Sequence, residues 1–265
     1  MSATTEHRID AGDVTLHVER IGERGRRTVV FAHGFTDHGR CWARVVDALG
    51  DRFDAVLVDA RNHGRSGTAV GGAAAQAQDL ATVITSLGLA NPVLVGHSMG
   101  ANAAAVLVAD RPGLVSRLVV EDPPWRSALP TSDAAAQRIA QLTAFLEHVI
   151  GLDDAGLVEL GRRQHGDWDE ADLAAWRAAK RLVRVEAAGG LELDDWRETV
   201  SRLSCPTLLV RGDPERGGVV TPRLAIEAAS LNDRLVSRPV VDAGHNIRRE
   251  NLQGFLDVVV PFLDE

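Results

Sequence analysis

The pentapeptide Gly96-His97-Ser98-Met99-Gly100 is the feature that most constrains how this chain can fold. An apolar run at 92–95 precedes it, and a helical stretch of small residues at 101–109 follows it. Strand, Gly-x-Ser-x-Gly and helix in this order predict a sharp turn that holds the serine hydroxyl clear of a sheet. Side chains two residues before and two after the serine would collide in such a turn, so both positions need glycine or another small residue. The sequence therefore predicts Ser98 as an exposed nucleophile at the end of a strand.

Composition excludes several classes of protein. A chain of 265 residues can bury one large core, as a single α/β domain with an insertion or as two small domains. The net charge of −8 comes without a basic run, so neither nucleic acid nor an anionic membrane surface is an expected partner. The polar start of the chain and the lack of a long apolar window predict no signal peptide and no membrane span, and we expect a cytoplasmic protein.

Cysteine usage and missing motifs argue against cofactors. Cys41 and Cys205 are the only two cysteines, and we expect two buried thiols rather than a disulfide. The sequence has no Cys/His cluster at metal-ligand spacing, no G-x-G-x-x-G and no P-loop. It therefore predicts neither a metal nor a nucleotide cofactor.

Short β-branched runs alternate with longer helical patterns, which is typical of a mostly parallel, doubly wound α/β sheet. The predicted strands are residues 14–19, 28–32, 55–59, 93–95, 118–121, 207–211 and 239–241. The predicted helices are residues 41–49, 73–87, 101–110 and 252–262. Strands from residue 28 onward are nearly all apolar, which indicates a sheet covered on both faces.

The alternation stops in residues 125–202, which contain amphipathic helical material and no convincing strand. Asp169 is the expected N-cap of one of these helices. We interpret 125–202 as a helical cap inserted into a core domain formed by 1–124 and 203–265. It would cover the carboxyl ends of the strands, where ligands bind in open α/β sheets. The cap region is rich in tryptophan, and the candidates for lining a substrate pocket are Trp125, Trp168 and Trp176.

A serine nucleophile needs a base, and His245 is the best placed of the nine histidines. It follows the last predicted strand and comes last in the chain order serine, acid, histidine. His97 adjoins Ser98 in the sequence, but its side chain should point away from the hydroxyl, so we interpret it as structural.

Five segments together make the chain resemble the α/β-hydrolase superfamily over nearly its whole length. They are His33-Gly34-Phe35, residues 59–66, the Gly-x-Ser-x-Gly pentapeptide, residues 211–215 and Ala243-Gly244-His245. The chain is most similar to capped serine hydrolases of the haloperoxidase, lactonase and esterase kind. The resemblance implies an oxyanion hole made by the backbone N–H groups of Phe35 and Met99. Met99 would sit at a helix N-terminus, where the helix dipole also favours negative charge.

The acid of the triad is where the sequence departs from the family pattern. Family members usually carry an aspartate after the seventh strand, in a Gly-Asp-x-Asp arrangement. Here the run reads Gly212-Asp213-Pro214-Glu215, and an extra Arg-Gly-Gly precedes Val219. Glu215 takes the usual position and is the favoured acid. Asp122, at the end of the sixth predicted strand, is the alternative, and Asp213 is a third candidate with an expected role in the turn.

These residues predict a serine hydrolase that cleaves a small, largely apolar carboxylic ester or lactone through an acyl-enzyme. We expect no cofactor and a monomer or homodimer. The alternatives are a cofactor-free perhydrolase or haloperoxidase, a carbon–carbon bond hydrolase, or a non-enzymatic small-molecule receptor on the same fold. The serine at the turn argues against epoxide hydrolases and haloalkane dehalogenases, which need a carboxylate there.

Overall fold

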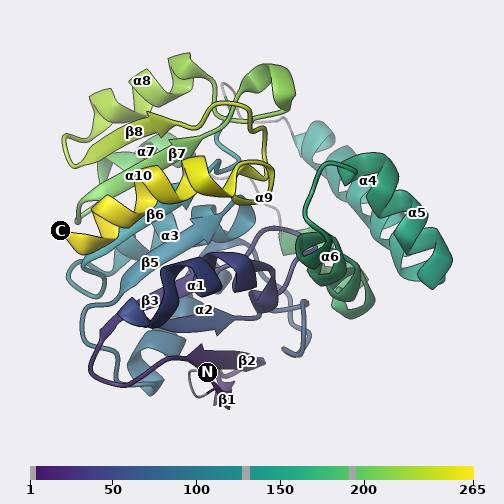
Figure 1. Cartoon of the computed structure of the whole chain (residues 1–265), viewed down its shortest axis with the longest axis horizontal. Helices are drawn as coiled ribbons and strands as arrows, with labels where there is room; N and C mark the ends of the chain where they lie inside the picture. Colours follow the sequence, from purple (N-terminus) through teal and green to yellow (C-terminus); the bar gives the residue numbers. More distant parts are fainter. Residues whose placement is uncertain (1–3, 127–131, 191–194) are drawn as a thin grey trace.

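A computed structural model of the chain describes residues 4–126, 132–190 and 195–265. Within them, eight strands form one sheet in the order β1-β2-β4-β3-β5-β6-β7-β8 (Figure 1). The strands are β1 (Thr4–Asp10), β2 (Thr15–Ile21), β3 (Arg27–Ala32), β4 (Phe53–Val58), β5 (Val93–His97), β6 (Arg117–Glu121), β7 (Thr207–Arg211) and β8 (Leu235–Pro239). Strand β2 runs antiparallel to both of its neighbours, and all other pairings are parallel.

Helices connect the parallel strands. The α-helices are α1 (Ala43–Leu49), α2 (Ala73–Ser86), α3 (Met99–Asp110), α4 (Ser132–Gly151), α5 (Asp154–His165), α6 (Glu170–Leu182), α7 (Trp196–Ser201), α8 (Pro222–Leu231), α9 (Ile247–Glu250) and α10 (Leu252–Asp264). The 3₁₀ turns are η1 (Gly39–Trp42), η2 (Gly50–Arg52), η3 (Val185–Gly190) and η4 (Pro214–Arg216). No helix in the described part of the chain is long and apolar enough to cross a bilayer.

Two apolar clusters cover the two faces of the sheet, as the apolar strands require. One lies between the sheet and helices α2, α3, α7 and α8, and it holds Leu80, Ala104, Val200 and Leu224. The other lies between the sheet and helices α1 and α10, and it includes Phe255. The fold is therefore a mostly parallel, doubly wound α/β sheet, as the sequence predicts.

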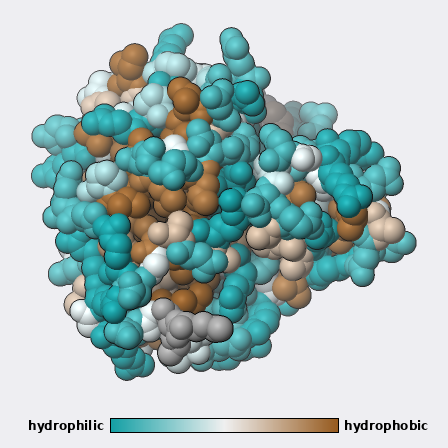
Figure 2. Space-filling view, in the orientation of Figure 1, coloured by the Kyte–Doolittle hydropathy of each residue, from teal (hydrophilic) through white to brown (hydrophobic). Residues whose placement is uncertain are grey.

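Helices α4, α5 and α6 form a separate layer that projects from the sheet body (Figure 1). This α4–α6 layer has its own apolar cluster, made of Val149, Leu157, Leu160, Trp168, Leu173 and Trp176. In Figure 2 its outer surface is mainly hydrophilic, whereas apolar residues gather over the sheet body. Three contacts join α6 to the segment after β3. They are Arg44 with Asp172 at 2.5 Å, Cys41 Sγ with the Ala175 carbonyl at 3.8 Å, and Lys180 with Thr36.

The elements differ from the predicted ones in several places. The last strand is β8, so Val240 and Val241 follow the strand instead of ending it. Strand β1 and helices α8 and α9 are absent from the prediction. The polar pattern of β1 hid it, because β1 is an edge strand with mostly exposed side chains. Helix α7, from the predicted cap segment 125–202, packs against α3 and α8 in the sheet body.

Other predictions agree with the structure. Asp169 caps α6 by accepting a hydrogen bond from the Ala171 N–H at 2.8 Å. Cys41 and Cys205 are both buried free thiols. Two parts of the predicted cap, residues 127–131 and 191–194, lie outside the described residues.

Candidate active site

Ser98 sits at the sharp turn between β5 and α3. Its backbone has φ 48° and ψ −112°, a conformation that only a tightly constrained turn imposes on a residue with a side chain. A Cβ atom on Gly96 would lie 2.6 Å from Ala101 Cα, and one on Gly100 would lie 2.5 Å from the Ala32 carbonyl oxygen. These contacts explain why both flanking positions are glycine.

His245 joins Ser98 to Asp122. The Nε2 atom of His245 lies 3.1 Å from Ser98 Oγ, and its Nδ1 atom lies 2.7 Å from Asp122 Oδ2. Each residue follows a parallel strand, since Ser98 comes after β5, Asp122 after β6 and His245 after β8. The carboxyl ends of parallel strands meet at one edge of the sheet, so the topology brings the three side chains together. The arrangement is that of a nucleophile, a base and an orienting acid.

The Asp122 carboxylate is fully buried and held by backbone groups. Its Oδ2 atom accepts a hydrogen bond from the Val219 N–H at 2.8 Å, and its Oδ1 atom accepts one from the Val220 N–H at 2.9 Å. The backbone of Asp122 has a φ of 40°, in the left-handed region. These bonds fix the carboxylate plane, so one oxygen faces the His245 ring.

The structure does not bring the favoured acid, Glu215, to His245. Glu215 is exposed in the 3₁₀ turn η4, and its backbone N–H donates to the Asp213 carboxylate at 2.9 Å. Asp213 thus caps this turn, in line with its expected role. The extra residues before Val219 instead place two N–H groups against Asp122, which is the alternative that the sequence offered.

His97 contacts both the backbone and the ring of His245. Its Nε2–H donates to the His245 carbonyl oxygen at 2.9 Å, and the two rings lie 4.8 Å apart. Burial, together with nearby Arg248 and His245, holds the pKa of His97 well below its usual value. The ring is therefore neutral and positions the backbone of His245.

A buried ion-pair network anchors the helix after His245. The Arg248 guanidinium bonds to Glu121 at 2.9 Å and to Asp37 at 3.2 Å, and it stacks 4.1 Å from the Trp42 ring centre. The Arg248 backbone N–H also donates to Glu121 Oε1 at 3.0 Å. Because Glu121 precedes Asp122, this pair ties α9 to the end of strand β6.

Phe35 and Met99 lie in segments that approach closely. Met99 is the first residue of α3, and the first N–H groups of a helix have no partner within the helix. Gly100 packs against the carbonyl groups of Ala32 and His33, where a Cβ atom would lie 2.5 Å from either oxygen, so the start of α3 lies against the end of β3. Phe35 follows Gly34 in that loop, and the next residue, Thr36, has a φ of 64°.

Ser98 and His245 open into a cavity of about 270 Å³ beneath the α4–α6 layer. Trp168 and Trp176 line it, together with Phe35. Trp125, the third tryptophan proposed from sequence for a pocket, does not line this cavity. It stacks on Trp196 at 5.2 Å within the core of the sheet body, so its role there is packing.

The cavity is more charged than the sequence predicts. Three cationic side chains line it, Arg138 from α4, Lys180 from α6 and Arg249 from α9, whereas Asp37 is its one lining carboxylate. The three cations were not among the residues predicted for the site. They come from three helices far apart in the chain, and no local pattern links them.

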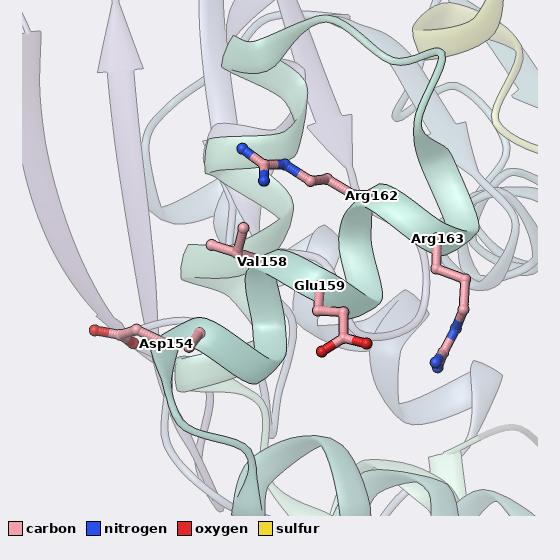
Figure 3. A pocket seen from close by; sticks show the side chains of 6 residues that line it. Asp154, Val158, Glu159, Arg162 and Arg163 are labelled. Atoms are coloured by element: carbon pink, nitrogen blue, oxygen red, sulfur yellow. The ribbon is translucent and has the colours of Figure 1, made fainter.

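Two other features of the described residues carry no catalytic group. A larger hollow of about 700 Å³ lies along one side of α5 (Figure 3). Its lining residues are Asp154, Ala155, Val158, Glu159, Arg162 and Arg163, which include no serine, cysteine or histidine and none of the residues around Ser98. This hollow is therefore not a candidate active site.

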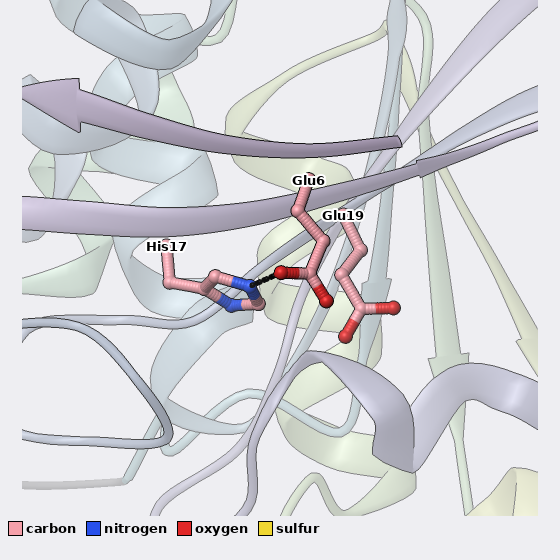
Figure 4. A group of neighbouring side chains, drawn as sticks. All are labelled: Glu6, His17 and Glu19. Atoms are coloured by element: carbon pink, nitrogen blue, oxygen red, sulfur yellow. Dashed lines mark ion pairs between the residues drawn. The ribbon is translucent and has the colours of Figure 1, made fainter. Parts of the chain in front are cut away.

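Glu6, His17 and Glu19 form the one metal-like cluster in the described part of the chain (Figure 4). His17 Nδ1 bonds to Asp59 at 2.9 Å, and its Nε2 faces Glu6 at 3.9 Å. Two arginines already occupy the cluster: Arg40 lies 2.6 Å from Glu19, and Arg65 pairs with Glu6. The carboxylates are thus compensated by guanidinium groups, and the cluster is an ion-pair network.

A family model of the alpha/beta hydrolase family matches residues 29–258, which include Ser98, Asp122 and His245. The chain belongs to the alpha/beta hydrolase family. It is an enzyme of this family, as its relatives are named hydrolases, esterases and lipases.

Two curated relatives match this α/β hydrolase over nearly its full length. N-formylmaleamate deformylase from Pseudomonas putida is 30% identical and covers 97% of this chain and 95% of the relative. 2-(Acetamidomethylene)succinate hydrolase from Mesorhizobium japonicum is 25% identical and covers 97% of this chain and 94% of the relative. A crystal structure of E-2-(acetamidomethylene)succinate hydrolase superposes with a TM-score of 0.78 at 25% identity, covering 99% of this chain and 100% of that one. An esterase from Exiguobacterium antarcticum has the same fold, with a TM-score of 0.80 at 18% identity and coverage of 98% and 100%.

Proposed function

We propose that this chain is a serine hydrolase that cleaves small carboxylic esters, lactones or amides through an acyl-enzyme on Ser98. The observation that carries the proposal is the pair of distances at His245, 3.1 Å to Ser98 Oγ and 2.7 Å to Asp122 Oδ2. A serine hydroxyl is a weak nucleophile until a base within hydrogen-bond reach takes its proton. The proposed triad is therefore Ser98, His245 and Asp122.

The proposed reaction has two steps, acylation of Ser98 and hydrolysis of the acyl-enzyme. In the first, Ser98 Oγ attacks the carbonyl carbon while His245 Nε2 takes the hydroxyl proton. The imidazolium then gives that proton to the leaving alkoxide or amine as its bond to the carbonyl carbon breaks. In the second, His245 takes a proton from water, the hydroxide attacks the acyl carbon, and the proton returns to Ser98 as the acid leaves. Asp122 holds the ring tautomer and stabilises the imidazolium in both steps.

The backbone N–H groups of Phe35 and Met99 are the proposed oxyanion hole. The negative charge that develops on the carbonyl oxygen would lie at the start of α3, where the helix dipole favours it. Loss of one such donor typically costs about 2.7–4 kcal/mol of transition-state stabilisation.

Amides belong beside esters in the proposal because of the two full-length relatives. One is named a deformylase of an N-formyl compound and the other a hydrolase of an acetamido compound. The same triad chemistry serves both bond types, since only the leaving group differs.

A fluorophosphonate probe with intact-mass and peptide analysis tests the proposal. We expect a single adduct on Ser98, complete loss of the adduct in Ser98→Ala, and loss of ester and formamide turnover in parallel. Ser116→Ala is a matched control, because Ser116 Oγ bonds to the Pro92 carbonyl at the opposite end of β5. Labelling at another serine, or a Ser98→Ala enzyme that keeps its turnover, would overturn the proposal.

A further inference from the structure

We propose that Arg138, Lys180 and Arg249 form a subsite for a carboxylate group of the substrate, so that the enzyme acts on small anionic esters or amides. The inference rests on the proposed function for the reacting half of the substrate. The three side chains line the same cavity as Ser98 and His245. A substrate carboxylate bound by them would hold its scissile carbonyl beside the serine.

The charge on the cavity wall is the first argument. The one lining carboxylate, Asp37, is already shared between Arg248 at 3.2 Å and Arg249 at 3.1 Å. His97 and His165 add no positive charge, because burial lowers the pKa of both, that of His165 to about 4. The lining residues thus carry more positive than negative charge in a cavity beneath the α4–α6 layer. Buried charges of one sign are costly unless a counter-charge joins them.

Unpartnered donors are the second argument. Arg249 is 4% exposed, and its Nε–H is buried with no hydrogen-bond partner among the described residues. The Nε–H of Arg138 is likewise buried with no hydrogen-bond partner among the described residues. Buried polar groups in folded proteins almost always have partners, so two open guanidinium donors on one cavity point to an absent acceptor. A planar carboxylate matches the fork of a guanidinium.

Lys180 also contributes a donor to the proposed carboxylate subsite. The residue is 2% exposed, and its ammonium group donates to the Thr36 carbonyl at 3.0 Å and to Thr36 Oγ1 at 2.6 Å. An ammonium group has three donors, so within the described residues one N–H is left for a ligand. The Trp176 ring, 4.6 Å from Nζ, holds the charge in place. Lys180 therefore both holds the Thr36 loop and lines the cavity.

Arg138 gives the cleanest test, since its removal breaks no ion pair in the described residues. Calorimetry on the Ser98→Ala protein would compare succinate, its neutral isostere succinamide, and inorganic phosphate. We expect succinate to bind at least about tenfold more tightly than either of the others, and the added Arg138→Gln change to weaken succinate about tenfold. Arg162→Gln, on the outer side of α5, is the matched control and should bind succinate like its parent. Equal succinate binding in the Arg138→Gln and Arg162→Gln proteins, or phosphate preferred to succinate, would overturn the subsite.

Kinetics separates the subsite from the chemistry. Methyl hydrogen succinate and dimethyl succinate differ only in one free carboxylate. We expect the active enzyme to favour the monoester by about tenfold or more in kcat/KM, and Arg138→Gln to lower that ratio about tenfold. If both esters turn over at equal kcat/KM, the subsite is wrong and the proposed function stands. If neither ester turns over and the fluorophosphonate probe does not label Ser98, while succinate still binds through Arg138, the proposed function is wrong and the subsite stands.

Discussion

The backbone N–H of Ser98 donates a hydrogen bond to the carbonyl oxygen of Glu121 at 2.9 Å. The bond continues the pairing of β5 with β6 by one residue beyond the strands, directly into the turn that carries the serine. Glu121 is followed by Asp122, so the proposed nucleophile and the proposed orienting acid are tied to neighbouring strand ends. Their separation is therefore set by the sheet itself and not by flexible loops.

Replacing the acid with its amide is the most direct test of the triad. An amide cannot stabilise the imidazolium as a carboxylate does, so we expect Asp122→Asn to lower kcat by about 10⁴-fold. Glu215→Gln is the matched control and should leave kcat within about twofold, because Glu215 is exposed in η4. Steady-state kinetics on one ester decides between them. If Glu215→Gln lowers kcat strongly and Asp122→Asn does not, the orienting acid is Glu215, in the loop after β7.

The close packing at Gly100 makes a sharp stability test. A Cβ atom there would lie 2.5 Å from the carbonyl oxygens of Ala32 and His33, both of which are main-chain atoms. We expect Gly100→Ala to lower the free energy of unfolding by about 1–3 kcal/mol and to reduce kcat, because the segments that carry Phe35 and Met99, the proposed oxyanion hole, would move apart. Gly151→Ala, which meets nothing within 4 Å, is the control. Urea unfolding compares the two, and equal stabilities would contradict the packing argument.

Removing one partner of the buried Arg248–Glu121 pair should destabilise the protein more than removing both charges. We expect Arg248→Met to lower the free energy of unfolding by about 3–5 kcal/mol, because it strands the Glu121 carboxylate in the core. Adding Glu121→Gln should recover part of that loss, since the stranded charge is then gone. Chemical denaturation of the two single variants and the double variant measures this. A double variant no more stable than Arg248→Met would show that the pair is not coupled.

Lys180 should make the preference for an anionic substrate depend on pH. Burial lowers the pKa of Lys180 to about 8, against the opposing effect of Asp37 and with Cys41 and Arg249 also nearby. The ammonium group is charged below this pKa and neutral above it. The monoester-to-diester ratio of kcat/KM should therefore fall as pH rises from about 7 to 9. Burial, together with Asp37, raises the pKa of Cys41 to about 12, so its thiol stays neutral across this window.

Lys180→Arg is the control for that pH dependence. Guanidinium groups keep their charge throughout the range, so the ratio should lose its fall between about pH 7 and 9. A wild-type ratio that is flat over the same range would show that Lys180 does not contribute to the preference.

The parts of the fold that could be predicted from sequence are those with local signals. The prediction of Ser98 as a nucleophile rests on a contiguous strand, Gly-x-Ser-x-Gly turn and helix, and that of His245 as its base rests on its place after a strand end. The acid was harder, since the choice between Asp122 and Glu215 depends on where the N–H groups of Val219 and Val220 fall in space. No single segment of sequence contains that information.

The cations of the cavity mark the limit of sequence reasoning. Arg138, Lys180 and Arg249 each occupy an ordinary position on a helix, and only the packing of α4, α6 and α9 brings them together. Expecting a largely apolar pocket followed from the leucine, alanine and tryptophan content of 125–202. The leucines Leu157, Leu160 and Leu173 fill the interior of the α4–α6 layer instead.

Because the α4–α6 layer has an apolar interior of its own, the part of the proposed recognition surface that it carries can change apart from the proposed triad. Positions on these helices that face the cavity can be exchanged without opening the core of the sheet body, and the strand ends that carry the proposed triad stay as they are. A combinatorial library confined to such positions would sample new substrates against a constant catalytic step. The same partition gives natural selection a way to diversify substrate use while the bond-breaking machinery is inherited intact.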